Sequence, residues 1–220
     1  MDSIEEGVGT NAGQASVVAR RRNPRGQDDR LREELLDAAD ALLAESGDAQ
    51  RLSLRQVARR VGIAATSIYL HFPDIADLKE AVTLRGYAEL ERARDAASRD
   101  ITDPAAALLA RMRAYAQFAL AYPGRYRLMF GAYLPSTLAY GAAQSPGARA
   151  LDQLAQSIQR CQEAGAARFD GDPTRLAILL WAAVHGFILL RLDRPQFPWP
   201  PIEDMVNEAT RRLVGLNGAV

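Results

Sequence analysis

The chain is poor in residues that form covalent or metal-held cross-links. Among its 220 residues there are one cysteine, Cys161, and two histidines. A single cysteine excludes an internal disulfide and a cysteine-rich zinc site, and it fits a reducing compartment. The N-terminus carries Asp2, Glu5 and Glu6 and no apolar run, so it lacks the pattern of a signal peptide. We therefore expect a cytoplasmic protein with no metal and no other cofactor.

The sequence also lacks strand patterns, internal repeats and an excess of charge of either sign. Its 27 basic and 27 acidic residues cancel. The uncharged stretch from Ala177 to Leu190 is too short to span a bilayer, so it predicts a helix that is buried on nearly all sides. We therefore expect an all-α protein that does not enter a membrane.

One stretch, residues 53–72, has the pattern of two short helices around a tight turn. Four apolar residues recur at helical spacing in its first half, namely Leu54, Val57, Ala58 and Val61. Ser53 precedes them as an N-cap, and Gly62 follows them, where glycine tolerates the positive φ that ends a helix. Residues 66–72 can begin a second helix. The pattern predicts a helix-turn-helix, whose second helix enters the major groove of DNA.

The charges around this stretch favour the same interpretation. Between Ala49 and Pro73 there is no aspartate or glutamate, whereas four arginines are present. They are Arg51, Arg55, Arg59 and Arg60. A local basic surface on a neutral protein is typical of a site for a polyanion.

About nine helices are expected along the chain, and their ranges follow from apolar spacing and from proline and glycine breaks. They are 29–46, 54–61, 66–72, 75–97, 104–121, 125–131, 147–164, 173–192 and 202–213. The far half of the fourth helix, Glu89 to Arg94, is strongly charged and predicts a solvated connector. A domain boundary is expected along this helix rather than in a flexible linker.

The helix-turn-helix stretch resembles the DNA-binding domain of the tetracycline-repressor (TetR) family of bacterial regulators. The matching segments are Leu52–Ala58, Val61–Ile63 and Ile68–Phe72. Two positions depart from the family pattern: Ala64 replaces the usual serine at the start of the recognition helix, and Ile75 replaces the usual lysine at the start of the next helix. Each departure removes a cap or a phosphate contact.

The C-terminal half resembles one TetR subgroup, which is named for its Trp, His and Gly. The segments that carry this resemblance are Trp181–Gly186 and Pro123–Phe130. The resemblance implies a helical ligand-binding and dimerisation domain. We therefore expect a disordered arm with a basic cluster over residues 1–27, a DNA-binding domain over 28–80 and a C-terminal domain over 81–217. The arm either reaches DNA or is a solubilising tail.

The resemblance also implies a set of DNA contacts. Tyr69 and His71 are expected to contact phosphates; the alternatives are that Tyr69 covers the small core and that His71 only caps. Arg55 is expected to anchor a phosphate. The full set is Ser53, Arg55, Ala65, Thr66, Ser67, Tyr69, His71 and Lys79, with 65–67 placed to meet base edges.

Large apolar and aromatic residues of the C-terminal half either line a ligand cavity or fill the core. The expected lining is Met112, Tyr115, Phe118, Tyr122, Met129, Phe130, Trp181, His185 and Leu189. His185 is interpreted as a hydrogen-bonded core histidine and not as a metal ligand, because no second histidine or cysteine lies at ligand spacing.

Dimerisation is expected from the family, which pairs its last two helices with their copies. Gly186 within a helix costs about 1 kcal/mol of stability relative to alanine. We therefore expect it to mark a close crossing of two helices, which could lie at the dimer interface. The expected dimer contacts are Gly186, Leu190, Met205, Ala209 and Leu213.

Together these patterns predict a homodimeric repressor that binds a palindromic double-stranded DNA operator and leaves it when a small hydrophobic effector binds. Within the same class, the alternative is an activator or a corepressor-type regulator. In other classes, the alternatives are a helical-bundle enzyme or carrier, or a structural dimer. The lack of a nucleophile–base pair at readable spacing disfavours an enzyme.

Overall fold

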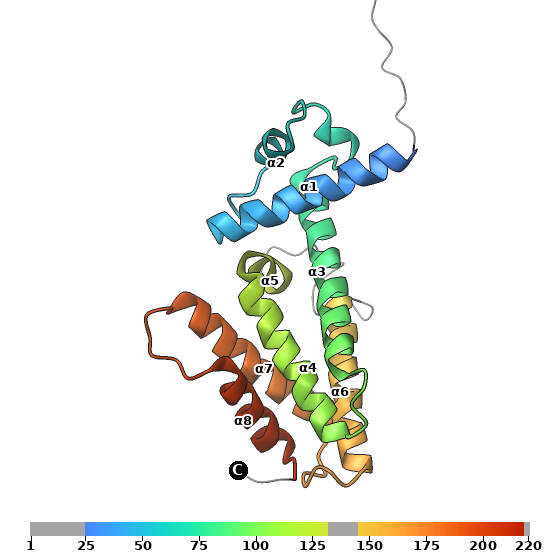
Figure 1. The fold of residues 1–220 in the computed structure, drawn as a ribbon, viewed down its shortest axis with the longest axis vertical. Helices are drawn as coiled ribbons and strands as arrows, with labels where there is room; N and C mark the ends of the chain where they lie inside the picture. The colour runs from blue at the N-terminus through green and yellow to red at the C-terminus, as the bar shows by residue number, and fades with distance from the viewer. Residues whose placement is uncertain (1–24, 132–144, 218–220) are drawn as a thin grey trace, which may run out of the picture.

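The computed structural model describes residues 25–131 and 145–217, which form helices joined by short connections (Figure 1). The described residues contain eight α-helices and one 3-10 helix, η1. The elements are α1 (Arg25–Ser46), α2 (Leu54–Val61), η1 (Ile68–Leu70), α3 (Ile75–Ser98), α4 (Pro104–Ala121), α5 (Pro123–Phe130), α6 (Pro146–Glu163), α7 (Pro173–Asp193) and α8 (Ile202–Val214). The all-α prediction is confirmed. Residues 1–24 of the expected arm lie outside the described residues.

Polar residues and a glycine fix the ends of α2 as the sequence predicts. Ser53 accepts a hydrogen bond from the Gln56 backbone N–H, and its hydroxyl donates to Gln56 Oε1 at 2.8 Å. Gly62 ends the helix with a φ of 80° and donates its N–H to the carbonyls of Ala58 and Arg59. The left-handed conformation at Gly62 turns the chain sharply, which orients the segment that follows.

The predicted second helix of the motif, residues 66–72, is shorter and tighter than expected. Only Ile68–Leu70 is helical, and it is a 3-10 helix. The N–H of Ser67 bonds to the carbonyl of Ala64, and the N–H of His71 to that of Ile68, so the i→i+3 spacing continues on both sides of η1. A segment this short, ending at Pro73, gains too few bonds to offset helix nucleation.

Buried side chains form two clusters. The N-terminal cluster joins α1, α2, η1 and the start of α3, and the C-terminal cluster joins α4 to α8 with the rest of α3. Leu78 and Val82 of α3 belong to the first cluster, whereas Tyr87 and Leu90 belong to the second. Leu128 of α5 belongs to the first cluster. Thus α3 and α5 both take part in the two cores, while the boundary at residue 80 stays a prediction.

Glycines allow α5 to lie close to α1 and α3, below α1 in Figure 1. A Cβ added at Gly124 would lie 2.2 Å from the Leu43 carbonyl oxygen of α1. A Cβ added at Gly86 of α3 would lie 2.6 Å from the Met129 sulfur. Around Gly186, nothing lies within 4 Å of such a Cβ. The close crossings are therefore at Gly86 and Gly124, and Gly186 makes none within the described part of this chain.

Candidate nucleic-acid interface and effector cavity

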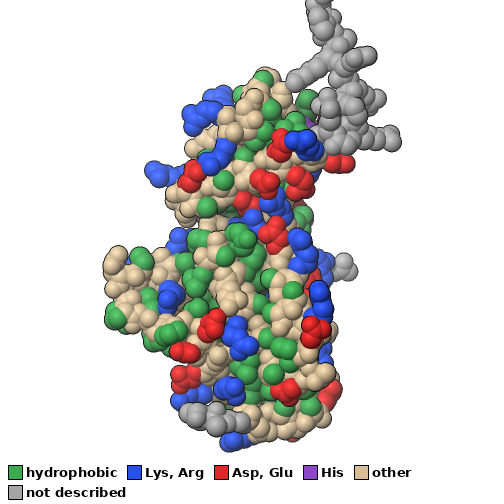
Figure 2. Space-filling view, in the orientation of Figure 1, with side chains coloured by type: hydrophobic (Ala, Val, Ile, Leu, Met, Phe, Trp, Pro, Cys, Tyr) green, Lys and Arg blue, Asp and Glu red, His purple; other side chains and the backbone are tan. Residues whose placement is uncertain are grey.

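The end of the molecule that carries α2 is basic. Arg51, Arg55 and Arg59 are exposed there, and none of the three forms an ion pair within residues 25–131 and 145–217. Arg60 differs, because its Nη2 lies 2.7 Å from Glu45 Oε1. Figure 2 shows basic side chains over this end. Three unpaired cations on one small surface favour a polyanionic partner.

Three predicted contact residues meet at the N-terminus of α2. Ser53, Arg55 and Tyr69 line one shallow depression, which Asp74 also borders. The Tyr69 side chain is 49% exposed. Free backbone N–H groups and the positive end of the helix dipole favour a phosphate at such a helix start. The structure therefore brings together three of the predicted DNA contacts, while His71, which was also expected to contact phosphate, does not line the depression.

The other predicted contact residues are placed less uniformly. Ala65 and Thr66 are exposed in the turn before η1, whereas Ser67 is only 6% exposed and faces the core. The prediction that Ser67 meets base edges therefore has no support in this arrangement. His71 is half-buried and accepts a hydrogen bond from Arg32 through its backbone oxygen. Lys79 is half-buried on α3.

Sequence reasoning missed Leu70, which is 80% exposed beside Tyr69. Ile68 and Phe72 are buried, and of the three residues between them Tyr69 and Leu70 face outward. The sequence could have predicted this exposure, because the apolar residues Ile68 and Phe72 lie at i and i+4 and mark the buried face. An exposed leucine on this surface is suited to apolar contact with a thymine methyl group.

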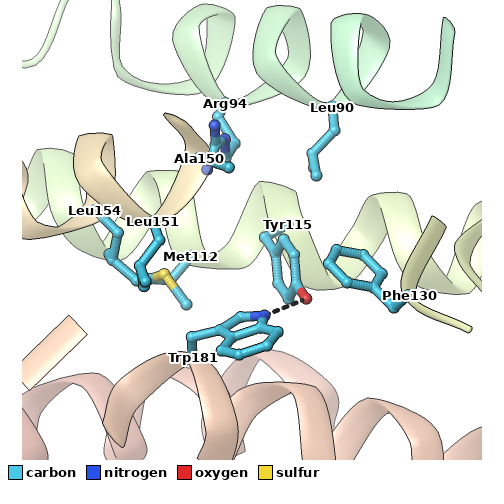
Figure 3. A pocket seen from close by; sticks show the side chains of 9 residues that line it. All are labelled: Leu90, Arg94, Met112, Tyr115, Phe130, Ala150, Leu151, Leu154 and Trp181. Atoms are coloured by element: carbon cyan, nitrogen blue, oxygen red, sulfur yellow. Dashed lines mark hydrogen bonds between the residues drawn. The ribbon is translucent and has the colours of Figure 1, made fainter. Parts of the chain in front are cut away.

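A small cavity lies between α3, α4, α6 and α7 (Figure 3). Four of its lining residues were predicted, and five were not. The lining is Leu90, Arg94, Met112, Tyr115, Phe130, Ala150, Leu151, Leu154 and Trp181. Its volume of about 30 Å³ has room for one or two water molecules. A drug-sized ligand therefore requires the surrounding helices to move apart.

Five residues predicted to line the cavity lie elsewhere. Phe118 and Met129 are buried in the core, and Leu189 is half-buried on α7. Tyr122 is 45% exposed, and the Arg125 guanidinium lies 4.8 Å from its ring centroid. The fifth is His185. The alternative expectation, that these residues fill the core, is correct for Phe118 and Met129.

His185 belongs to a chain of hydrogen bonds behind the cavity wall. Trp181 Nε1 donates to the Tyr115 hydroxyl at 3.3 Å, and the hydroxyls of Tyr115 and Tyr126 lie 2.7 Å apart. The Tyr126 hydroxyl lies 2.5 Å from His185 Nδ1. The bonds from Trp181 through Tyr115 and Tyr126 run in one consistent direction if Tyr126 donates to Nδ1 of a neutral imidazole. Burial also lowers the pKa of His185, which favours the neutral form.

The prediction that Glu89 to Arg94 is solvated is wrong for Arg94. This side chain is 9% exposed and lines the cavity from α3. The apolar residues of α6 that cover it, Leu151 and Leu154, could not be paired with α3 from sequence spacing alone. The only indication of this burial in the sequence was that Arg94 places a charge on the apolar face of a helix.

An ion-pair network connects α5 to the DNA-binding end. Arg125 of α5, 5% exposed, donates from Nε to Asp40 of α1 at 2.7 Å and also pairs with Glu89 of α3. Burial raises the pKa of Asp40 although Arg125 beside it acts to lower it. Two N–H groups of Arg125 engage the two carboxylate oxygens of Asp40, and this bidentate geometry fixes how α5 sits against α1.

Helix α7 is not buried on nearly all sides, so that prediction is wrong for the single chain. Its side chains Ile178, Leu179 and Leu190 are each 45% exposed or more. By length and composition the helix could cross a membrane, with a mean hydropathy of 1.8 in a window that is 22% buried. In the fold it packs against α6 and α8, and an apolar face is left uncovered.

The predicted dimer contacts divide between that face and the interior. Gly186 is half-buried and Leu190 is exposed on α7. Met205 and Leu213 are half-buried on α8. Ala209 is only 9% exposed and packs in the core of its own chain, so the structure does not offer it to a partner.

Comparisons with known proteins agree with this arrangement. A protein of unknown function from Rhodococcus sp. RHA1 has the same fold with a TM-score of 0.72 and 27% identity, covering 90% of this chain and 98% of that one. The TetR-family transcriptional regulator PfmR of Thermus thermophilus matches with a TM-score of 0.64 and 20% identity, covering 84% and 99%. SmeT, the repressor of a Stenotrophomonas maltophilia multidrug efflux pump, matches with a TM-score of 0.61 and 21% identity, covering 84% and 88%.

A curated relative is also similar in sequence over a short region. It is an uncharacterized HTH-type transcriptional regulator of Haemophilus influenzae, 46% identical over 52 residues, which are 24% of this chain. The chain spans about a quarter of the length of that relative.

The fold, the helix-turn-helix and its basic surface define a DNA-binding transcriptional regulator. Residues 35–82 match the model of the bacterial regulatory proteins of the tetR family, and residues 108–215 match that of a tetracyclin repressor-like C-terminal domain. The chain belongs to the TetR family of regulators. The second match is not specific to the Trp-His-Gly subgroup, which stays a prediction.

Proposed function

We propose that this regulator is a homodimeric repressor that a small hydrophobic effector releases from a palindromic operator. The observation that carries the proposal is the sharing of α3 and α5 between the two cores. Leu90 of α3 and Phe130 of α5 line the cavity, whereas Val82 and Leu128 of the same helices pack in the DNA-binding core. A change in the cavity is therefore transmitted to the DNA-binding end.

The small size of the cavity supports the assignment of the compact arrangement to the ligand-free state. At about 30 Å³ it cannot hold an effector without separation of the helices around it. The compact arrangement described above is then the ligand-free state, and an opened cavity is the ligand-bound state. The effector shifts the equilibrium only by the difference in its affinity for the two states. SmeT, whose fold is similar to that of this chain at 20% sequence identity, has been solved in complex with triclosan.

Dimerisation is part of the proposal, because a palindrome requires two recognition segments at a fixed spacing. The uncovered apolar face of α7, with Leu179 and Leu190, supplies a surface for self-association. In an isologous interface this face meets its own copy.

The test is binding to the DNA that flanks the protein's own gene, compared with an unrelated duplex over a salt series. We expect specific binding whose log affinity falls linearly with log salt concentration. Tyr69→Phe should weaken binding by about tenfold to 100-fold, as the loss of a hydrogen bond to a charged group predicts, and Tyr69→Ala by more. Absence of any binding at low salt would refute the proposal.

The sign of the ligand effect decides between repressor release and the activator or corepressor alternative. An effector that strengthens operator binding would favour the alternative. The enzyme alternative gains no support from Cys161, because burial raises the pKa of this thiol to about 11, which keeps it protonated and unreactive.

A further inference from the structure

Arg94 lies where an apolar cavity meets a polar groove. It lines the cavity with Met112 and Trp181 (Figure 3). It also lines an adjoining groove with Arg149 and Gln153. The groove has a volume of about 110 Å³. The side chain of Arg94 extends from α3 toward Ala150 of α6, so its guanidinium lies at the rim between the two spaces.

The guanidinium of Arg94 is buried without a matching anion. Its Nη2 donates to Gln153 Oε1 at 2.7 Å, but its Nε is buried and has no hydrogen-bond partner among the described residues. Within those residues Arg94 forms no ion pair. A buried charge that lacks both an ion-pair partner and part of its hydrogen bonds is unfavourable.

The charged neighbours of Arg94 are mostly engaged with other groups. Asp95 pairs with Arg111 at 2.6 Å, and Glu91 accepts a hydrogen bond from Gln153 Nε2 at 2.5 Å. Burial lowers the pKa of Arg94, and the positive charge of Arg111 lowers it further. Glu91, which also lines the groove, and Asp95 favour the charged form of Arg94 from a distance, but neither forms an ion pair with it among the described residues. An anion that enters this space would therefore meet a guanidinium whose Nε is still free to donate.

We propose that the effector is an organic acid, with a carboxylate that binds the Arg94 guanidinium and an apolar body that enters the cavity. The carboxylate accepts a hydrogen bond from Nε while Nη2 keeps its bond to Gln153. The apolar body lies against Met112, Leu151 and Phe130. This inference rests on the proposed function in one respect: it takes the cavity to be the effector site.

The test compares matched acids and amides on the full-length dimer. Phenylacetate and octanoate are titrated by isothermal calorimetry at neutral pH, beside phenylacetamide and octanamide, which differ only in charge at the polar end. We expect each acid to bind about tenfold or more tightly than its amide, because a hydrogen bond between charged partners is replaced by one to a neutral group. Equal affinities, or the failure of both acids to bind, would overturn the proposal.

Variants assign the effect to the guanidinium. Arg94→Met should abolish the preference for acids, and Arg94→Lys should retain part of it, because the charge stays while Nε is lost. Arg92→Met is the matched control, since Arg92 is exposed on the same helix. Circular dichroism verifies that each variant is folded. A preference for acids that survives in Arg94→Met would contradict the proposal.

The outcome separates this inference from the proposed function. The acids are afterwards added to the operator complex. An acid that binds through Arg94 but leaves operator affinity unchanged would refute release by effector and leave the acid site intact. Amides that release the operator as well as the acids would refute the acid site and leave the repressor proposal intact.

Discussion

At the scale of single residues, the hydrogen-bond chain that ends at His185 makes stability depend on pH. The Tyr126 hydroxyl can donate to His185 Nδ1 when the imidazole is neutral, and burial lowers the pKa of His185 below its usual 6.5. The unfolded chain therefore binds the proton at a higher pH than the folded chain does. Stability from this group is complete above pH 6.5 and is lost as the pH falls toward the lowered pKa of the folded state.

We expect His185→Gln to remove this pH dependence. Between about pH 8 and about pH 5, the free energy of unfolding of the wild type should fall more steeply than that of His185→Gln. Urea unfolding at several pH values measures both slopes, and the variant serves as the reference for all other titrating groups. Parallel slopes would show that the imidazole titrates alike in the folded and unfolded chains.

The residue scale also shows what the sequence could and could not predict. Ser53, Arg55 and Tyr69 belong to the set of DNA contacts that the family resemblance implied, and the short stretch of α2 and η1 brings them to one depression. Arg94 was predicted to be solvated, because its burial depends on α6, which packs on α3 from a distant part of the chain. Local periodicity carries no information on which distant helix covers a residue.

At the scale of elements, α5 connects the C-terminal core with the DNA-binding end, as α3 also does. Arg125 pairs with Asp40 of α1, and Leu128 fills the N-terminal core. The sequence predicted a helix over 125–131, but the helix begins at Pro123, whose fixed φ suits a first turn. The start at Pro123 places Gly124 against α1, a contact that no local pattern reveals.

Gly124→Ala should separate α5 from α1. Its Cβ would lie 2.2 Å from the Leu43 carbonyl oxygen, and a backbone atom cannot yield as a side chain can. We expect a loss of about 1 to 3 kcal/mol in the free energy of unfolding, even though alanine favours a helix. Gly171→Ala is the control, because its Cβ would meet Leu176 at an ordinary 3.6 Å. Equal stability of both variants would disprove a tight α1–α5 contact.

At the scale of the whole molecule, the exposed apolar face of α7 is the surface that the proposed dimer would bury. Leu190 is 53% exposed and Leu179 is 48% exposed. The sequence identified this helix and its apolar character, but it could not show which face the chain itself covers. A second copy of the chain accounts for the uncovered face without a membrane.

Leu190→Glu should dissociate the dimer. Each copy would place a charge in an interface that buries apolar surface, and symmetry doubles the effect. We expect dimer affinity to fall about 100-fold or more, measured by analytical ultracentrifugation. Leu84→Glu, at a side chain that is 43% exposed on α3, is the matched control and should stay dimeric. An intact Leu190→Glu dimer would place the interface elsewhere.

The central claim is that the state of the cavity sets operator affinity, and a cavity-filling variant tests it without an effector. Ala150→Leu adds volume to the 30 Å³ space between α6 and α3, and Gln156→Leu adds the same side chain at an exposed position of α6. We would measure operator affinity for both variants and the wild type. The account predicts about tenfold weaker binding by a folded, dimeric Ala150→Leu, with Gln156→Leu unchanged. Wild-type affinity in a folded Ala150→Leu dimer would contradict it.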